Sequence, residues 1–250
     1  MPLTKPQKTI FSDTSRFRVV AAGRRFGKTF LSLWEIARVA RFPNKKIYYI
    51  APSYRMGKQI IWTMLCDEMR QRRWIKKINE SDLTITLVNN SRISVRSADN
   101  FDSMRGVSLD CAILDEAAYM SKETWTSVIR PTLSDSGGTA LFISTPRGYD
   151  WFHELWTNAH NNKDWSAHQF TTVQGGQVTE EEVESAKQDL DLRTFRTEYM
   201  ATFESVANNV YYAWDMANVK AWEEPVPRTI LVGIDFNIDP VTSIVCVQTE

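Results

Sequence analysis

Residues 22–29 have the sequence Ala22-Gly23-Arg24-Arg25-Phe26-Gly27-Lys28-Thr29. They follow the apolar run 19–22, which predicts a strand, and they open residues 29–40, whose apolar side chains recur at helical spacing. A strand, a Gly-Lys-Thr loop and a helix form the context of a phosphate-binding loop. In such a loop, backbone N–H groups surround a phosphate and the helix N-terminus adds its dipole. The sequence therefore predicts a nucleotide site here.

The loop residues have distinct expected roles. Lys28 is expected to reach the β- and γ-phosphates, and the hydroxyl of Thr29 to ligate Mg²⁺. Ala22 departs from the usual pattern, because it stands where the first glycine is normally found. The competing interpretation is a chance Gly-Lys-Thr in an ordinary loop. The loop residues that are expected to bind the nucleotide are Ala22, Gly23, Arg24, Arg25, Phe26, Gly27, Lys28 and Thr29.

A second motif lies 87 residues further on, where the apolar run 112–114 ends in Asp115 and Glu116. This is the form of a Walker B strand, in which Asp115 would hold Mg²⁺ and Glu116 would orient and deprotonate the attacking water. Taken alone, the pair could be two solvated acids at a strand end. Together with the phosphate loop, it predicts hydrolysis of a nucleoside triphosphate.

The rest of the chain alternates strand-like and helical patterns, which predicts an α/β fold with a mostly parallel sheet. A hairpin is expected where two alternating runs, 83–88 and 92–96, are joined by Asn89-Asn90-Ser91. The other expected strands are 47–51, 111–114, 139–144, 167–171 and 230–234. The expected helices are 55–71, 121–133, 150–160 and 179–201.

Composition adds two constraints. The formal net charge is zero, but the charges are unevenly distributed. Residues 1–110 carry 21 Lys and Arg against 9 Asp and Glu, and residues 111–250 carry 9 Lys and Arg against 21 Asp and Glu. This asymmetry suggests a polyanionic partner for one part of the chain. No apolar stretch is long enough for a membrane helix, and the three scattered cysteines favour reduced thiols over a metal site or a disulfide framework.

With these motifs in view, the chain resembles the large terminase subunit of tailed bacteriophages, the DNA-packaging motor. The loop at 22–29, with its Arg24, is similar to that family's deviant phosphate loop, and Arg105-Gly106 precedes the acidic strand as the family's Arg-Gly does. Ser144-Thr145-Pro146-Arg147-Gly148 resembles the coupling motif, and Leu3-x-x-Pro6-Gln7 resembles the segment that reads adenine. Gly233-Ile234-Asp235 resembles the first strand of the family's nuclease.

The resemblance implies a domain plan. Residues 1–201 would form a P-loop ATPase core of the additional-strand type, with the hairpin at 83–96 inserted before the Walker B strand. Residues 202–227 would be a linker, and 228–250 the first strands of a truncated RNase H-like nuclease. Of that nuclease's divalent-metal ligands, only Asp235 can be matched, so the chain is expected to be a fragment without nuclease activity of its own.

The resemblance also implies a function. The cofactors would be ATP and Mg²⁺, with a further divalent metal for the nuclease of the complete protein. The motor would translocate double-stranded DNA into a procapsid, and the nuclease would cut the DNA concatemer. The implied partners are a portal protein, a small terminase subunit and copies of the chain in a ring, with no membrane. The expected location is the host cytoplasm, with transient docking on the portal vertex and absence from the mature virion.

Several site residues keep two interpretations. Arg24 is expected to act as an arginine finger within its own subunit, and Arg25 to pair with an acid; Arg105 is either a finger for a neighbouring subunit or a structural arginine. Ser144 and Thr145 would sense the γ-phosphate, cap the following helix, or both. Gln7 either hydrogen-bonds adenine or is solvated.

A basic run at the predicted end of helix 55–71 is a candidate for contact with DNA phosphates, or is simply a solvated face. Its members are Arg70, Arg72, Arg73, Lys76 and Lys77. The motifs also allow two other functions. One is a helicase of superfamily 1 or 2, or a DNA translocase not involved in packaging. The other is a non-catalytic nucleotide-dependent clamp.

Overall fold

The computed structural model describes residues 2–204, 229–234 and 244–249. The chain divides into two compact units, Met1–Glu204 and Ser205–Glu250. In the second unit, β9 (Thr229–Ile234) pairs antiparallel with β10 (Ile244–Thr249). A strand was expected at 230–234, and β9 confirms it. Most of the predicted linker, and Asp235, lie outside the described residues.

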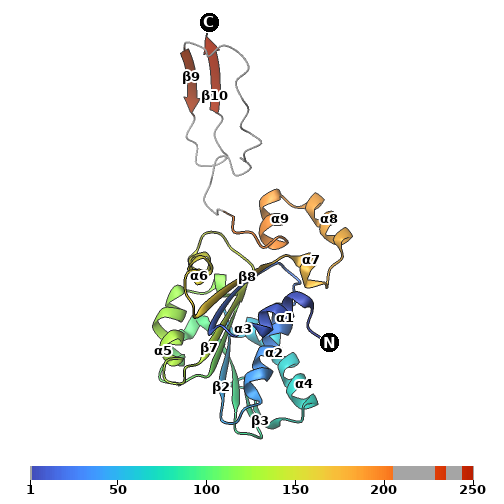
Figure 1. The fold of residues 1–250 in the computed structure, drawn as a ribbon, viewed down its shortest axis with the longest axis vertical. Helices are drawn as coiled ribbons and strands as arrows, with labels where there is room; N and C mark the ends of the chain where they lie inside the picture. Colours follow the sequence, from blue (N-terminus) through green and yellow to red (C-terminus); the bar gives the residue numbers. More distant parts are fainter. Residues whose placement is uncertain (1, 205–228, 235–243, 250) are drawn as a thin grey trace. The chain divides into compact units, whose positions relative to one another are not determined.

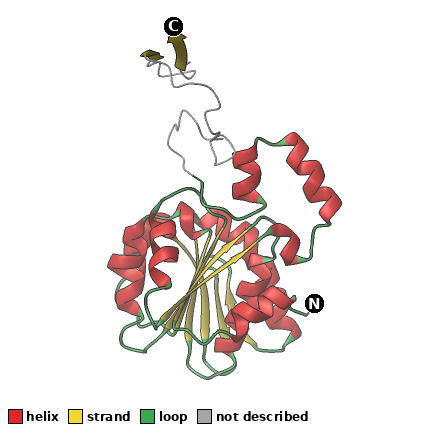
Figure 2. Cartoon of the chain, turned by 45° about the horizontal axis from the view of Figure 1, so that its top comes forward, coloured by secondary structure: helices red, strands yellow, loops and turns green. Residues whose placement is uncertain are grey.

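The first unit is built on an eight-stranded sheet with the order β3-β4-β5-β2-β6-β7-β1-β8 (Figures 1 and 2). The strands from β5 to β8 in this order run parallel, and β3, β4 and β5 form an antiparallel meander at one edge. The expected α/β fold is therefore confirmed. The strands are β1 (Phe17–Ala22), β2 (Lys46–Ala51), β3 (Ile75–Asn79), β4 (Thr84–Leu87), β5 (Arg92–Ser97), β6 (Cys111–Asp115), β7 (Thr139–Ser144) and β8 (Trp165–Phe170).

Helices cover the two faces of the sheet, and each face has its own apolar core (Figure 1). One face packs against α1 (Lys5–Ser12), α2 (Lys28–Ala40) and the helical segment 54–71, which is α3 (Tyr54–Gly57), a π-helical turn η1 (Lys58–Trp62) and α4 (Thr63–Gln71). The other packs against η2 (Ala98–Met104), η3 (Ala117–Tyr119), η4 (Thr124–Ile129), α5 (Arg130–Thr132) and α6 (Trp151–Ala159).

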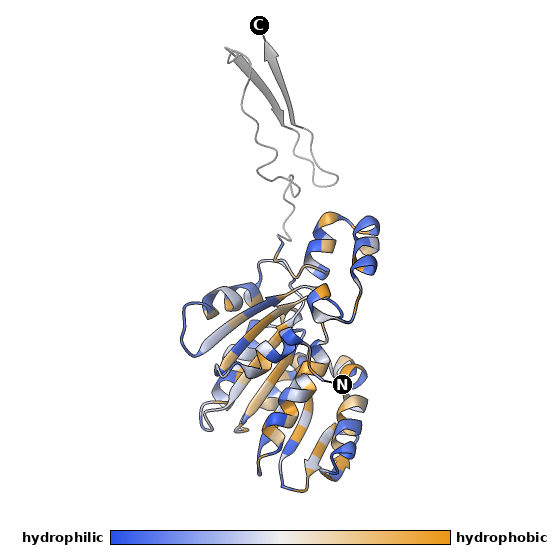
Figure 3. Ribbon diagram, turned by 45° about the vertical axis from the view of Figure 1, so that its right-hand side comes forward, coloured by the Kyte–Doolittle hydropathy of each residue, from blue (hydrophilic) through white to orange (hydrophobic). Residues whose placement is uncertain are grey.

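The central strands are buried on both sides, and Figure 3 shows them mainly in the colours of hydrophobic residues. Every residue of β1 and β6 is buried. Apart from Arg18, which pairs with Glu35, and the terminal Asp115, their residues are apolar, as is typical of a parallel sheet covered by helices. The described tryptophans also serve the core: Trp125, for example, packs edge-on against Phe142.

The strand inserted between the two motif strands, β1 and β6, is not the one that was expected. The hairpin predicted at 83–96 exists, as β4 and β5, but it lies toward the sheet edge, beyond β2. The strand that separates β1 from β6 is β7, which pairs parallel with both. Sequence order cannot reveal this, because β7 follows β6 along the chain and is inserted between the two motif strands only in space.

One further expectation was wrong. Residues 179–201 do not form one helix: α8 (Glu180–Asp189) ends at an extended Leu190, and the side chain of Asp191 caps a separate α9 (Leu192–Glu198). The basic run does begin at the expected helix end, since α4 stops at Gln71, but residues 75–79 form the strand β3, which was not predicted. Pairing with β4 outweighs the weak strand pattern of this lysine-rich segment.

The segment after β8 folds back over the phosphate loop. The Thr172 hydroxyl, in α7 (Thr172–Gly175), donates to the carbonyl of Arg24 at 2.8 Å, and the Arg24 N–H donates to the carbonyl of Glu198 at 2.7 Å. The Thr172 N–H in turn donates to the carbonyl of Tyr199. Residues 171–201, here called the strap, therefore hold the loop from its outer side.

Candidate nucleotide site

The phosphate loop joins β1 to α2, as the sequence predicts. Gly27 has φ +89°, in the left-handed region that favours glycine, and Arg25 also has a positive φ of 60°. Lys28 is the first residue of α2, so the exposed N–H groups of a 13-residue helix face the loop. This is an arrangement that binds phosphate.

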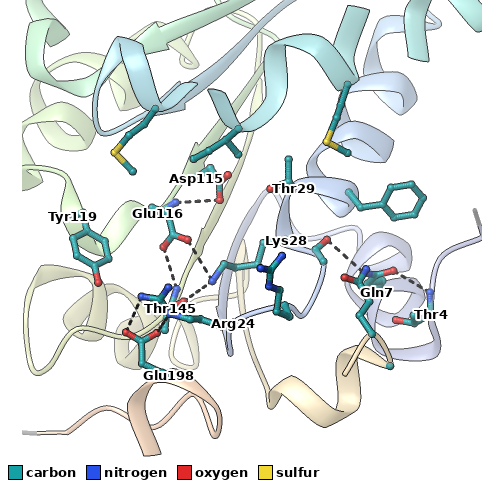
Figure 4. Close-up of a pocket in the computed structure, with 18 of the residues that line it drawn as sticks. Thr4, Gln7, Arg24, Lys28, Thr29, Asp115, Glu116, Tyr119, Thr145 and Glu198 are labelled. Carbon is teal, nitrogen blue, oxygen red and sulfur yellow. Dashed lines mark hydrogen bonds and ion pairs between the residues drawn. The ribbon is translucent and has the colours of Figure 1, made fainter. Parts of the chain in front are cut away.

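Lys28 joins three elements at the carboxyl ends of the strands (Figure 4). Its Nζ donates to Thr145 Oγ1 at 2.5 Å and to the carbonyl of Ala22 at 3.3 Å. It also lies 3.4 Å from Glu116 Oε1. The lysine, the proposed base and the residue after β7 therefore meet around one ammonium group. The sequence predicted all three, and the structure brings them together.

Glu116 is held by the segment after β7. Its Oε2 accepts from the Ser144 hydroxyl at 3.2 Å and from the Thr145 N–H at 3.4 Å. Glu116 itself has φ 55°, so the chain turns sharply as it leaves β6. The structure does not support capping of the next helix by Ser144 or Thr145, because the side chain of Asp150 caps α6.

Asp115 is the buried acid at the end of β6, with 3% of its surface exposed. The Tyr49 hydroxyl, from β2, donates to Asp115 Oδ2, and the Glu116 N–H donates to Oδ1 at 3.1 Å. Burial, followed by the nearby charge of Glu116, raises the pKa of Asp115 to about 6. Burial and the adjacent Asp115 also raise the pKa of Tyr49, so this phenol stays a donor. The role of Tyr49 could not be predicted, because nothing in residues 47–51 indicates which strand lies beside β6.

Gln7 is buried, not solvated. Its Nε2 donates to the carbonyl of Phe26 at 3.0 Å, and its Oε1 accepts from the Thr4 N–H at 3.0 Å. Gln7 therefore ties α1 to the phosphate loop, while it also lines the pocket described below. Contact with adenine remains a prediction.

The three arginines lie in different surroundings. Arg24 forms a two-point ion pair with Glu198 of the strap, with Nε to Oε2 at 2.5 Å and Nη2 to Oε1 at 3.2 Å. Arg25 lines the pocket and pairs with no acid among the described residues, so the pairing expected for it was wrong. Arg105 pairs with Asp102 at 2.7 Å and donates to the carbonyl of Ser127 at 3.2 Å. Arg105 does not line the pocket of its own chain, so it does not complete the described site from within the chain.

The phosphate loop, Glu116, Asp115, Thr145 and Gln7 line a pocket of about 1030 Å³ (Figure 4). A cavity of this size is at the upper end of the usual range for ligand sites. Among the described residues, its walls come from α1, the phosphate loop, the helical segment 54–71, the ends of β6 and β7, and the strap. Thr29 and Asp115 both line it, and a hydroxyl and a carboxylate are oxygen donors of the type that Mg²⁺ prefers. The donor set therefore fits Mg²⁺.

The five members of the basic run do not form one surface. Arg70 pairs with Asp67, and Arg72 pairs with Glu68 and stacks on the rings of Trp34 and Trp74. The other three members are exposed: Arg73 precedes β3, and Lys76 and Lys77 lie on it. Only Lys77 has a register partner on β4, because the strand has an irregularity between Ile75 and Lys77 that leaves Lys76 unpaired.

The strand order and the residues of the site are those of a P-loop nucleoside triphosphatase of the additional-strand type. The family model described as "Terminase large subunit, T4likevirus-type, N-terminal" matches residues 19–214. The large terminase subunit of Escherichia phage T5 is 30% identical over 207 residues, which cover 78% of this chain and 46% of that protein. The one from Thermus virus P23-45 is 27% identical, covering 90% of this chain and 53% of that protein. The chain belongs to the large terminase subunit family.

Solved structures agree with this assignment. The large terminase ATPase domain of Thermus phage P74-26 has a TM-score of 0.72 at 26% identity, and the match covers 81% of this chain and 94% of that domain. A large terminase from a thermophilic bacteriophage has the same fold, with a TM-score of 0.72 at 17% identity over 100% of this chain and 66% of that one. The chain spans about half the length of the curated relatives that it matches.

Proposed function

We propose that this chain is the ATP-hydrolysing motor part of a large terminase subunit, which moves double-stranded DNA into a viral procapsid. The observation that carries the proposal is the convergence of Lys28, Thr145 and Glu116 at the phosphate loop, beside the buried Asp115. Related proteins support the choice of nucleotide: the large terminase of the thermophilic bacteriophage was solved in complex with ADP and with ATP-γ-S.

The chemistry proposed is in-line attack of water on the γ-phosphate. Lys28 and the N–H groups of the loop bind the phosphates, and Thr29 and Asp115 hold Mg²⁺, which supplies charge neutralisation when bound. Glu116 accepts the proton of the water. A bound phosphate competes with Glu116 for Lys28, now 3.4 Å from the carboxylate. Loss of that ion pair frees the carboxylate to act as the base.

Ser144 and Thr145 are placed to relay the state of the site. Both bind Glu116, and Thr145 also binds Lys28. A change at the γ-phosphate therefore reaches the end of β7 through direct contacts. Arg24 is proposed to leave Glu198 and stabilise the transition state, and Arg105 to serve a neighbouring subunit.

The partners proposed follow from the family. They are double-stranded DNA, a portal protein, a small terminase subunit and further copies of the chain in a ring. The proposed location is the host cytoplasm, with docking at the portal vertex during packaging. In the complete protein, a metal-dependent nuclease including Asp235 would cut the concatemer. No helix in the described part of the chain is long and apolar enough to cross a membrane.

Two substitutions test the chemistry. Lys28→Ala removes the charge that clamps the phosphates, so ATP binding or turnover should be lost. Glu116→Gln keeps the shape of the side chain but removes the base, so ATP should bind and hydrolysis should fall by at least about 10²-fold. ATP binding and phosphate release are measured for both. A Glu116→Gln protein with near-normal turnover would falsify the role of Glu116 as base, and a wild-type chain that binds ATP without turnover would favour the clamp.

A helicase is the second candidate that the motifs allow, but the structure and the comparisons do not favour it. Such an enzyme needs a second RecA-like domain. The ranges 2–204, 229–234 and 244–249 contain one parallel sheet, and the family match points to packaging.

A further inference from the structure

The sheet has an open polar face at the end that contains β3, β4 and β5. The residues of these strands that point to one side belong to the apolar core under α2 and α4, including Ile85, Ile93 and Val95. On the opposite side the strands carry polar and charged residues. Two hollows lie on that side, of about 240 and 260 Å³, and they share Asp82, Thr84 and Arg92 as lining residues.

Strand register arranges this face as rows. Across four adjacent strands, Lys46 is opposite Arg92, Arg92 is opposite Thr86, and Thr86 is opposite Lys77. The next row contains Tyr48, Ser94, Thr84 and Asn79 in the same strand order. With about 4.8 Å between strands, the first row places three cations across about 14 Å. We call the first row, Lys46, Arg92, Thr86 and Lys77, the basic row.

The cations of the basic row are exposed and have no acid of their own. Two acids lie beside the row, and each pairs with another residue: Asp82, which lines both hollows, pairs with Arg96, and Asp110, which accepts from the Lys46 N–H, pairs with Lys45. Within the described residues, Lys46, Arg92 and Lys77 form no ion pair. A solvated strand face needs polar residues, but it does not need three unpaired charges of one sign at neighbouring register positions. Like charges opposite each other cost stability, which favours a role in binding an anion.

We propose that the basic row, together with the accessible Thr84 and Asn79 of the next row, contacts the phosphate backbone of duplex DNA; the choice of occupant rests on the proposed function. Lysine and arginine supply the charge, and threonine and asparagine are among the other side chains that bind phosphates. The width of the row is similar to that of the DNA major groove, about 12 Å. A flat row offers no helix or ribbon to enter a groove, so the contact is independent of sequence, as a translocating motor requires.

Two matched triple substitutions of the full chain test the proposal. The first removes the basic row (Lys46→Ala, Arg92→Ala, Lys77→Ala). The second removes the same charge from the helical segment 54–71 and the turn after it, which lie on the opposite face of the sheet (Lys58→Ala, Arg70→Ala, Arg73→Ala). Binding to a random 30-base-pair duplex is measured by fluorescence anisotropy over a salt series. Melting temperature and ATP affinity are recorded for each protein, which separates loss of the fold from loss of contact.

The first triple should weaken binding by about tenfold or more. It should reduce the slope of log K against log salt by about 2.7, because each neutralised phosphate contributes about 0.9. The second triple should leave the slope near the wild-type value. The charge-preserving triple Lys46→Arg, Arg92→Lys, Lys77→Arg should restore binding.

Four results overturn the proposal. Equal losses for both alanine triples would mean that net charge, not this face, governs binding. Stronger binding of the row to an acidic peptide than to duplex DNA would mean a protein partner. If the wild-type chain hydrolyses ATP and the first alanine triple binds duplex normally, the proposed surface is wrong but the proposed function stands. If the wild-type chain binds no duplex at all, both the surface and the DNA-moving function are wrong.

Discussion

Asp115 is a carboxylate whose surroundings favour its neutral form. Its pKa is raised to about 6 by burial and by the charge of Glu116, above the ordinary value of 3.8. A raised pKa in the folded state means that ionisation costs folding free energy. The protein therefore loses stability as the pH rises from about 4 through about 6. The cost is at most about 3 kcal/mol, since each pKa unit corresponds to about 1.4 kcal/mol.

This cost gives a prediction for Asp115→Asn in the absence of Mg²⁺. The amide cannot ionise but has only one acceptor oxygen, so it keeps one of the two hydrogen bonds that Asp115 accepts from the Tyr49 hydroxyl and the Glu116 N–H, and the lost one is worth about 1 kcal/mol. At pH 7 the variant should be more stable than the wild type by about 1–2 kcal/mol, and at pH 4 the advantage should disappear. Thermal melting with a chelator at both pH values checks it. Lower stability of the variant at pH 7 would show that the surroundings of Asp115 stabilise its ionised form. Turnover should be lost in either case.

At the scale of elements, the strap and the phosphate loop approach each other closely at Gly23. A Cβ at position 23 would lie 2.5 Å from Thr172 Oγ1 and 2.8 Å from the carbonyl of Tyr199. The same Thr172 hydroxyl binds the Arg24 carbonyl. Glycine at this position therefore serves close approach of the strap, not an unusual backbone angle.

Gly23→Ala should push the strap away from the loop. We expect a loss of about 1–3 kcal/mol in stability, as for other overpacked sites, together with a rise in the ATP dissociation constant. The control is Gly106→Ala, where the added methyl group meets nothing within 4 Å and the cost comes only from a positive φ of 74°. Denaturant melts and nucleotide titration give both quantities. Nearly unchanged nucleotide affinity in Gly23→Ala would mean that the strap does not shape the loop.

At the scale of the whole molecule, Arg105 is a group that could act in the site of a neighbouring chain. Arg105 is more than half exposed, held by Asp102 and the Ser127 carbonyl, and it does not line its own pocket. An arginine finger supplied by a neighbour raises the rate by about 10³–10⁵. If Arg105 has this role, turnover per chain should increase with protein concentration as rings form.

Mixing two inactive proteins tests the role directly. Arg105→Ala lacks the finger and Glu116→Gln lacks the base, so each alone should be inactive. A mixed ring contains some interfaces with a native Glu116 on one side and a native Arg105 on the other, and part of the turnover should return. If Arg105→Ala alone keeps full activity, and mixing restores nothing where wild-type rings form, the arginine is structural.

The sequence by itself determined the parts of this protein that depend on neighbours along the chain. The phosphate loop is one continuous segment, and the strand ending in Asp115 and Glu116 is another, so both were predictable, as were the alternating strands and helices between them. The capped break between α8 and α9 is local too. Its signal, Asp191 after Leu190, is present in the sequence but is weaker than the helical pattern on either side.

Only the tertiary structure decided which strands are neighbours. The insertion of β7 between β1 and β6, the hydrogen bond of Tyr49 to Asp115, the closure of the strap on Arg24 and the alignment of Lys46, Arg92 and Lys77 all join residues that are distant in sequence. Strand pairing is chosen by the burial of whole faces and the closure of backbone hydrogen bonds across the sheet. A local pattern reports which side of a strand is apolar, but not which strand will lie beside it.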